Sequence, residues 1–288
     1  MEKHTQQGLQ NNWSKTAARS RANRRAASAP LAFELAAYQR LLRPALRGKH
    51  SPRVLILGAT PELRDLVIRC GATSIAVDVS ADMLEQLTAV MRYRNDGRNL
   101  FIKADWLKLG ELLQPGSFAA VLADCSLNNV PPDKHRPLFL NIARLLQPGG
   151  CFITRNFVYL PEKEVDTLAT IQQKYRTKRL NWLWIIIHLG QYSPWRSRTY
   201  SPKTKILKIS RVLDLLFAAL KRRELTFSRE DFKKLLNLKQ HAYHVNHVTF
   251  SEREWLAMVR RHFIVQERWS HPRYEWTQNA PIWCLKKR

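Results

Sequence analysis

Three carboxylates end short apolar runs in the first half of the sequence. Asp78 closes SIAVDVS, Asp105 closes LFIKADW, and Asp124 closes FAAVLADCS. Apolar runs of this length are typical of strands that are buried on both faces of a parallel sheet. The carboxyl ends of such strands form one edge, where ligands bind. We therefore expect the three side chains to lie at one ligand-binding edge.

Asp78 stands 20 residues after Gly58, which ends the first apolar run, RVLILG. At the end of a second strand, a carboxylate with this spacing can accept hydrogen bonds from both ribose hydroxyls of an adenine nucleoside. The alternative for Asp78 is a helix cap or a solvated loop acid. The spacing favours the ribose contact.

The turn from Gly58 to Glu62, GATPE, distinguishes nucleoside ligands by charge. It lacks the further glycines that let a pyrophosphate approach a helix N-terminus. Glu62 in the first helical turn suits the helix dipole but repels a phosphate. A ligand with an adenosine end and a cationic tail fits better, and S-adenosylmethionine has this form. The alternative is that Glu62 only complements the dipole.

Asp105 and Trp106 can serve the base of such a ligand. The carboxylate can accept from an adenine amino group, and the indole can cover the ring, a stacking contact of about 1–3 kcal/mol. A core or helix-cap role is the alternative for this pair. Asp124 could hold an ammonium group, and Asn128 and Asn129 follow where an acceptor would approach.

Strands and helices must alternate to position these residues. Helix caps are expected at Thr60, Ser80 and Ser251, the last with Glu254 in a capping box. The expected strands are 53–58, 74–80, 100–106, 118–126, 151–157, 263–270 and 280–287. The expected helices are 33–46, 61–71, 81–94, 132–146 and 250–263, with a tight turn at 147–150.

The segments VLILGATPEL, AVDVSADML, KADW, FAAVLADCSLNNV and LLQPGGCFI together resemble the class I (Rossmann-like) S-adenosylmethionine-dependent methyltransferases. The resemblance covers Arg53–Phe157 well and the last 38 residues more loosely. It implies a doubly wound, seven-stranded, mostly parallel sheet whose last strand is antiparallel. A helical insertion would follow the fifth strand.

The resemblance also implies S-adenosylmethionine as cofactor and a set of residues that bind it. Two departures concern the first motif: Ile56 stands where the family usually has an acid, and Thr60 and Glu62 replace glycines. The motif is then either a working variant, in which Glu62 contacts the methionine portion, or the mark of a degenerate site. The cofactor-binding residues so predicted are Gly58, Thr60, Glu62, Asp78, Asp105, Trp106 and Asp124.

Net charge is +25, and it is unevenly distributed. Residues 51–155 carry only +2, whereas 156–250 carry +11, which suggests an anionic partner. We expect four parts: a basic N-terminal arm and helix (1–50), a cofactor-binding core (51–157), an inserted substrate or lid subdomain (158–250), and a last helix with two strands of the core (251–288).

The insertion holds LNWLWIIIHLGQYSPWRSRTY, in which aromatic residues and arginines alternate. Such residues can stack nucleobases, hold a planar acidic substrate or rest on a membrane; the alternative is a lid helix packed by its apolar face. The 11-residue apolar segment is too short to span a bilayer. The spacing in HAYHVNH, without cysteines, does not favour a metal site. Asp124, His135 and His244 are candidates for a catalytic base.

Together these features predict a methyltransferase that acts on a small acceptor, anionic or aromatic. RNA or DNA is the second acceptor class, and a non-catalytic nucleic-acid-binding protein on a degenerate methyltransferase fold is the rival. No CxxC pairing occurs, so buried thiols and a cytoplasmic location are expected. The N-terminal segment also resembles that of a divergent branch of the family, which implies that Trp13 closes over the cofactor; the alternative is a disordered arm that contacts anions.

Overall fold

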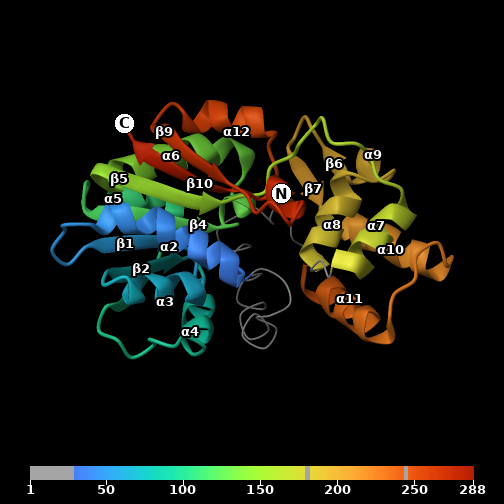
Figure 1. The fold of residues 1–288 in the computed structure, drawn as a ribbon, viewed down its shortest axis with the longest axis horizontal. Coiled ribbons are helices and arrows are strands. Elements are labelled where there is room, and N and C mark those ends of the chain that lie inside the picture. Colours follow the sequence, from blue (N-terminus) through green and yellow to red (C-terminus); the bar gives the residue numbers. More distant parts are fainter. Residues whose placement is uncertain (1–28, 179–181, 243–245) are drawn as a thin grey trace. The chain divides into compact units, whose positions relative to one another are not determined.

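The computed structural model describes residues 29–178, 182–242 and 246–288, and it divides into two compact units (Figure 1). The sheet unit comprises Ala29–Phe157 and Arg253–Arg288. The inserted unit comprises Val158–Glu252 and interrupts the sheet unit in sequence. Trp13 and His244 lie outside the described residues.

Seven strands form one sheet in the order β3-β2-β1-β4-β5-β10-β9, as the sequence predicts. β1 lies between β2 and β4 and pairs in parallel with both, and β10 is antiparallel to β5 and β9. The strands are β1 (Arg53–Leu57), β2 (Thr73–Asp78), β3 (Asn99–Lys103), β4 (Phe118–Asp124), β5 (Leu146–Arg155), β9 (Phe263–Trp269) and β10 (Ile282–Lys287).

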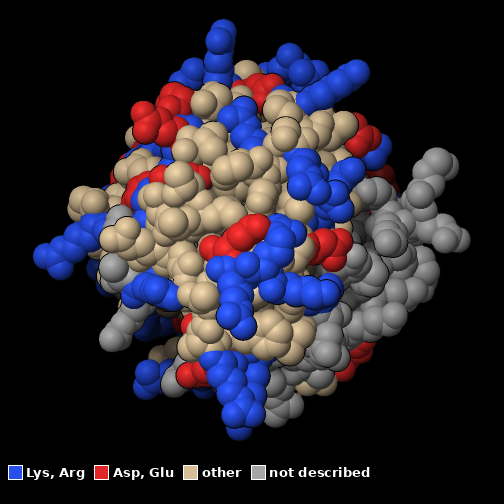
Figure 2. Space-filling view, turned by 90° about the vertical axis from the view of Figure 1, so that its right-hand side faces the viewer, with Lys and Arg blue, Asp and Glu red and all other residues tan. Residues whose placement is uncertain are grey.

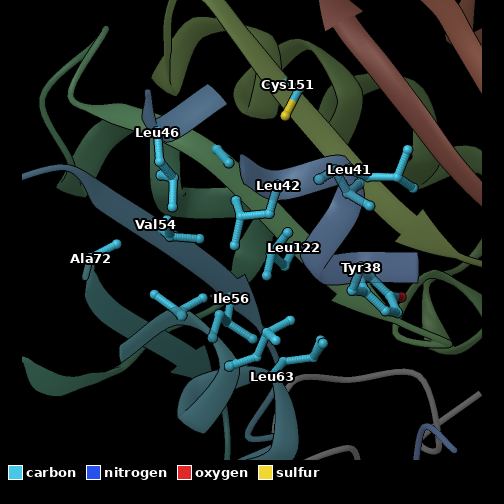
Figure 3. Close-up of a cluster of buried hydrophobic side chains, with 14 of the residues drawn as sticks. Tyr38, Leu41, Leu42, Leu46, Val54, Ile56, Leu63, Ala72, Leu122 and Cys151 are labelled. Carbon is cyan, nitrogen blue, oxygen red and sulfur yellow. The ribbon is translucent and has the colours of Figure 1, made fainter. Parts of the chain in front are cut away.

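Helices cover both faces of the sheet. On one face, α2 (Ala32–Leu46) and α3 (Pro61–Arg69) pack on β1 and β4, and Tyr38, Leu42, Ile56 and Leu122 are buried there (Figure 3). The other face packs on α6 (His135–Leu145) and α12 (Glu252–Val259) through the rings of these buried residues: Phe139, Phe152, Trp255, Phe263 and Trp283. Burial on both faces explains why β1, β2 and β4 read as continuous apolar runs. The edge strand β3, also expected to be buried, is largely exposed.

Two local expectations differ from the structure. The helix expected at 81–94 ends at Thr88, as α4 (Ala81–Thr88), because the Asp65 carboxylate accepts from the backbone N–H groups of Arg92 and Tyr93 and holds them in a turn. Thr60 stands at the N-cap of α3, but its side chain makes no capping hydrogen bond. Ser80 does cap α4, accepting from the Met83 N–H at 3.2 Å.

The expected turn at 147–150 lies inside β5. Leu146 pairs with Phe118, the register then shifts, and Cys151 pairs with Ala120. Gly149 has a φ of 73°, which favours glycine. The segment is therefore a bulged start of the strand.

The inserted unit is mixed, whereas a helical insertion was expected. Its helices are α7 (Leu168–Lys178), α8 (Trp182–Gln191), α9 (Arg196–Thr199), α10 (Ile209–Lys221) and α11 (Arg229–Ala242). Three short strands, β6 (Tyr200–Ser201), β7 (Ile206–Lys208) and β8 (Asn246–Val248), form an antiparallel sheet. Two- and three-residue strands are too short to show the alternation that identifies a strand in a sequence.

The two ends of the inserted unit are held together. The Tyr159 N–H donates to the Phe250 carbonyl at 2.8 Å, and the Glu252 N–H donates to the Tyr159 carbonyl at 3.3 Å. Tyr159 and Ser251 form a parallel bridge. The chain therefore enters and leaves this unit as a hydrogen-bonded pair of segments.

All four cysteines are unpaired, and Cys125, Cys151 and Cys284 are buried, whereas Cys70, which was also expected to be buried, is half-buried. Within the described ranges no helix has both the length and the apolar character needed to cross a membrane.

Candidate functional site

Gly58 follows β1 and turns the chain toward α3. Its φ of 106° favours glycine. Its N–H donates to the Val77 carbonyl at 2.8 Å, so the turn is attached to the end of β2. A Cβ on Gly58 would lie 3.3 Å from the Ser126 Oγ and 4.0 Å from a carbon of the Trp106 ring. The sequence of the turn is thus constrained both by conformation and by close neighbours.

Asp78 ends β2, and its side chain is buried without a charged partner. Its Oδ1 accepts from the Ser80 N–H at 2.9 Å, and no cation among the described residues pairs with it. Burial raises the pKa of Asp78 to about 6, and backbone hydrogen bonds oppose this only in part. A buried carboxylate with so few donors has capacity for further hydrogen bonds, as a ribose contact requires.

The Trp106 side chain lies beside Gly58 and contacts the end of β2. Its indole N–H donates to the Val77 carbonyl at 2.7 Å, so the ring is fixed next to the turn. The Asp105 Oδ1 accepts from the Leu107 N–H at 2.9 Å and caps a short 3-10 helix. A helix cap is the alternative role that the sequence indicated for Asp105. Its contact with an adenine amino group stays a prediction.

Asp124 ends β4 in a buried ion-pair network with Arg155 and Glu34. The Arg155 guanidinium donates to both Asp124 oxygens, at 2.6 and 2.9 Å, and to the Glu34 carboxylate on α2. Glu34 is buried completely, which raises its pKa although Arg155 opposes the shift. Tyr38 donates to the Ala123 carbonyl at 2.7 Å and accepts from the Arg155 N–H at 2.9 Å.

This network changes what Asp124 can do. Because Arg155 occupies both of its oxygens, Asp124 is poorly placed to accept a proton from an acceptor. The two acids and one arginine leave one negative charge at the carboxyl ends of β4 and β5. That excess negative charge suits a cationic ligand. The contact of Asp124 with an ammonium group stays a prediction, and Arg155 would set the orientation of the carboxylate.

The loop after β4 is strained and brought against the Gly58 turn. Cys125 has a φ of 55°, which is uncommon for a residue with a side chain and is typical of functional sites. Its N–H donates to the Arg155 carbonyl at 2.9 Å. The Ser126 hydroxyl donates to the Leu57 carbonyl at 2.6 Å. The ends of β1, β4 and β5 are thus joined by short hydrogen bonds.

The structure therefore brings together Gly58, Asp78, Trp106 and Asp124 at one edge, around the point where β1 separates β2 from β4. Glu62, in the first turn of α3, is half-buried near this turn. Sequence reasoning missed Arg155, Glu34, Tyr38 and Ser126. Only the position of Arg155 at the end of an apolar run signalled it.

The histidine candidates do not form a base at this edge. His135 begins α6, is buried, and its Nε2 lies 3.1 Å from the Leu127 carbonyl. Burial lowers the pKa of His135 to about 4, and that of His247 in β8 likewise to about 4. Both are neutral core histidines at physiological pH. In the described part of the chain no group of three or more His, Cys, Asp or Glu could hold a metal ion.

The aromatic side chains described between Trp184 and Tyr200, together with that of Tyr159, are buried. The rings of Tyr159 and Tyr200 lie 4.9 Å apart, and those of Tyr159 and Tyr192 lie 5.7 Å apart. Arg196 lies over the Tyr159 ring at 5.0 Å. The buried aromatics are Tyr159, Trp184, Tyr192, Trp195 and Tyr200. None of these rings offers an open face for base stacking, and a lid helix that packs on the sheet unit stays a prediction.

Comparison with known proteins finds a family match within the sheet unit. Residues 58–150, about a third of the chain, match the model of a family described as a methyltransferase domain. No curated protein sequence matches the chain.

Solved structures share the fold at low sequence identity. A putative Zn-dependent alcohol dehydrogenase from Rhodobacter sphaeroides has a TM-score of 0.56 and 14% identity, covering 96% of this chain and 97% of that one. An S-adenosylmethionine-dependent methyltransferase from Anabaena variabilis has a TM-score of 0.54 and 12% identity, covering 97% and 95%. The Burkholderia thailandensis 1,6-didemethyltoxoflavin-N1-methyltransferase has 0.50 and 14%, covering 98% and 90%.

At such identities these structures show the fold alone. The strand order, the family match and the motif positions agree with one another. Residues 58–150 therefore match a methyltransferase domain, and the chain shares its fold with the S-adenosylmethionine-dependent methyltransferase from Anabaena variabilis.

Proposed function

We propose that this protein transfers a methyl group from S-adenosylmethionine to a small acceptor, anionic or aromatic. The observation that carries the proposal is Asp78, a buried carboxylate that accepts from the Ser80 backbone N–H at 2.9 Å and has no cationic partner among the described residues. Ribose hydroxyls would supply the missing hydrogen bonds and stabilise its ionised form.

The remaining residues suit the rest of this cofactor. Trp106, fixed beside Gly58, would contact the adenosine, and the absence of a side chain at Gly58 would let a ligand approach the backbone. The excess negative charge of Glu34 and Asp124 over Arg155 complements the cationic methionine end. These roles predict a working variant of the first motif, with Glu62 half-buried at the start of α3.

The chemistry requires little from the protein besides alignment. Bound S-adenosylmethionine supplies a sulfonium methyl that an acceptor nucleophile can displace directly. The residues of this chain would orient the two partners and exclude water, which supplies much of the rate enhancement in such reactions. None of the candidate catalytic bases among the described residues is available to accept a proton at this edge. This favours a methyl acceptor from which the enzyme need not remove a proton.

An anionic acceptor is supported by the charge of the inserted unit's sequence, +11 over residues 156–250. The same charge supports RNA or DNA as a second acceptor class. A non-catalytic nucleic-acid-binding protein would leave Asp78 without a ligand.

Titration calorimetry tests the cofactor. S-adenosylmethionine and S-adenosylhomocysteine should each bind in a 1:1 ratio, whereas NAD, with its pyrophosphate, should not. Absence of binding to a folded protein would refute the enzyme. S-adenosylmethionine with a labelled methyl group, added with the protein to a cell extract, then distinguishes the acceptor classes. Methylated product that passes a small-pore filter supports a small-molecule acceptor, whereas product that is released by ribonuclease supports RNA.

A further inference from the structure

The inserted unit contains a long stretch without acids. Between residues 167 and 213 there are ten Lys or Arg and no Asp or Glu. Acids outside the stretch pair with cations of the same unit: Asp166 pairs with Lys174, which lies within the stretch, and Glu224 pairs with Arg222, which lies beyond it. The acid-free stretch therefore concentrates positive charge in one part of the unit.

Four exposed cations of this stretch gather on one hairpin. The four, named here the hairpin patch, are Arg198, Lys203, Lys208 and Arg211. Tyr200 pairs with Leu207 and Ser201 with Ile206, so β6 and β7 form a tight antiparallel hairpin. Arg198 precedes this pairing by two residues, Lys203 lies in the connecting turn, and Lys208 follows the pairing directly.

The hairpin is small, so these charges are close. Two-residue strands span about 7 Å. Arg211 lies within the first turn of α10, about 5 Å along the helix axis from Lys208. The patch therefore fits within about 15 Å, about twice the screening length at physiological salt, so each of its charges interacts mainly with its nearest neighbours.

No described residue neutralises the patch. None of its four side chains forms an ion pair with an acid of the described chain, and the first turn of α10 contains no acid. Arg196 is excluded from the patch because it lies over the Tyr159 ring at 5.0 Å. Like charges held this close repel one another unless an external anion compensates them.

The neighbouring apolar and aromatic residues identify the kind of anion. Trp195, Tyr200, Leu207 and Ile209 are all buried. Insertion into a lipid surface needs exposed apolar side chains, and stacking on single-stranded bases needs exposed rings. The hairpin offers neither. What remains outside is a set of cations suited to a regular array of phosphates.

We propose that the hairpin patch binds the phosphate backbone of double-stranded nucleic acid, independently of its sequence. A duplex presents one negative charge per about 1.7 Å of its axis, a density that a patch of this size can engage at several phosphates. Lys and Arg project at several places from the side of the molecule on which α7–α11 are drawn (Figure 2). The surface does not depend on methyl transfer and can serve whether or not the nucleic acid is the acceptor.

Fluorescence anisotropy of the full chain with a labelled RNA duplex of arbitrary sequence tests this proposal. The wild type should bind with an affinity that falls steeply as salt rises. Exchanging Arg198, Lys203 and Lys208 together for Gln should weaken binding at least about tenfold and lower the log–log salt slope by about 3. Thermal unfolding should be unchanged, because these side chains are exposed.

The matched control removes the same charge elsewhere. Arg136, Arg144 and Lys286 are exposed cations of the sheet unit, and their joint exchange for Gln should weaken binding less than about threefold. Equal loss in both triple variants would show that only net charge matters and would overturn the proposal. It would also fail if the wild type ignored the duplex at low salt, or if phosphatidylserine vesicles alone bound through the hairpin.

Discussion

Arg155 and Asp124, which end the neighbouring strands β5 and β4, are joined by two hydrogen bonds: Nε to Oδ1 at 2.6 Å and Nη2 to Oδ2 at 2.9 Å. The same guanidinium reaches Glu34 and so attaches α2 to the edge of the sheet. Removing one member of such a buried network costs much more than the network contributes in total, because the remaining charges are left unpaired.

Exchange of Arg155 for Met should therefore lower the free energy of unfolding by about 3–5 kcal/mol. Guanidinium denaturation followed by circular dichroism measures this. The control is Arg40→Met, because Arg40 pairs with Glu267 while both side chains are largely exposed, and loss of that pair should cost less than about 1 kcal/mol. Similar losses in the two variants would contradict the buried network.

Exchange of Asp78 for Asn should stabilise the cofactor-free protein and weaken cofactor binding. Burial raises the pKa of Asp78 to about 6, so its charge reduces the free energy of unfolding above that pH, by about 2–3 kcal/mol. Asn avoids this penalty, so the gain should be full above pH 6 and vanish below about pH 4. Loss of a charged acceptor should weaken S-adenosylmethionine about 10- to 100-fold.

Asp82→Asn is the control for Asp78. Asp82 is exposed in the first turn of α4, four residues away. Its exchange should leave the affinity for S-adenosylmethionine unchanged and should not raise the free energy of unfolding of the cofactor-free protein. An Asp78→Asn variant that binds the cofactor like the wild type would remove the ribose assignment.

Acidification should destabilise the protein through two buried histidines. Burial lowers the pKa of His135 and His247 to about 4 each. The unfolded chain therefore binds more protons between pH 6.5 and 4, and stability present above pH 6.5 is lost as pH falls through this range. Urea unfolding at pH 7 and pH 5 should show the loss.

His135→Gln should make this pH dependence shallower, whereas exchange of the exposed His50 for Gln should leave it unchanged. Asp78 acts in the opposite direction, so its contribution must be taken from the difference between wild type and Asp78→Asn. Equal stability at pH 7 and pH 5 would show that these histidines are accessible to protons in the folded state.

Two glycines with positive φ allow the effect of backbone strain to be distinguished from the effect of a side chain close to the cofactor site. Gly58→Ala and Gly71→Ala should both lower stability, because φ is 106° and 82° respectively. Only at Gly58 would the added Cβ approach another residue, lying 3.3 Å from the Ser126 hydroxyl. Calorimetry should find the affinity for S-adenosylmethionine reduced by Gly58→Ala and retained by Gly71→Ala. Equal affinities would show that the Gly58 turn does not contact the cofactor.

The sheet could be predicted because its signals are local. Each strand is a short apolar run between turn or capping residues, and Ser80 and Asp78 occupy the places that their spacing indicated. Helix α4 ended early because Asp65, far along the chain, holds Arg92 and Tyr93 in a turn. Such a tertiary hydrogen bond leaves no periodic trace in the sequence.

The candidate site was foreseen only in part for the same reason. Asp124, Arg155 and Glu34 are separated by 31 and 121 residues from one another along the chain, and nothing local links them. The aromatic residues of the insertion illustrate the opposite case. Their composition suggested a binding surface, but apolar packing within the unit buries Tyr192, Trp195 and Tyr200.

The hydrogen-bonded junction at Tyr159 has an entropic consequence. A flexible connection as long as the 95 residues from Val158 to Glu252 costs about 4 kcal/mol in chain entropy by the logarithmic law of loop closure. Because Tyr159 is bonded to Phe250 and Glu252, the folded insertion presents its two ends already side by side. The folded insertion therefore connects its two flanking strands as a linker of a few residues would. Closing such a short connection costs about 2–3 kcal/mol less chain entropy than closing a flexible one of the full length.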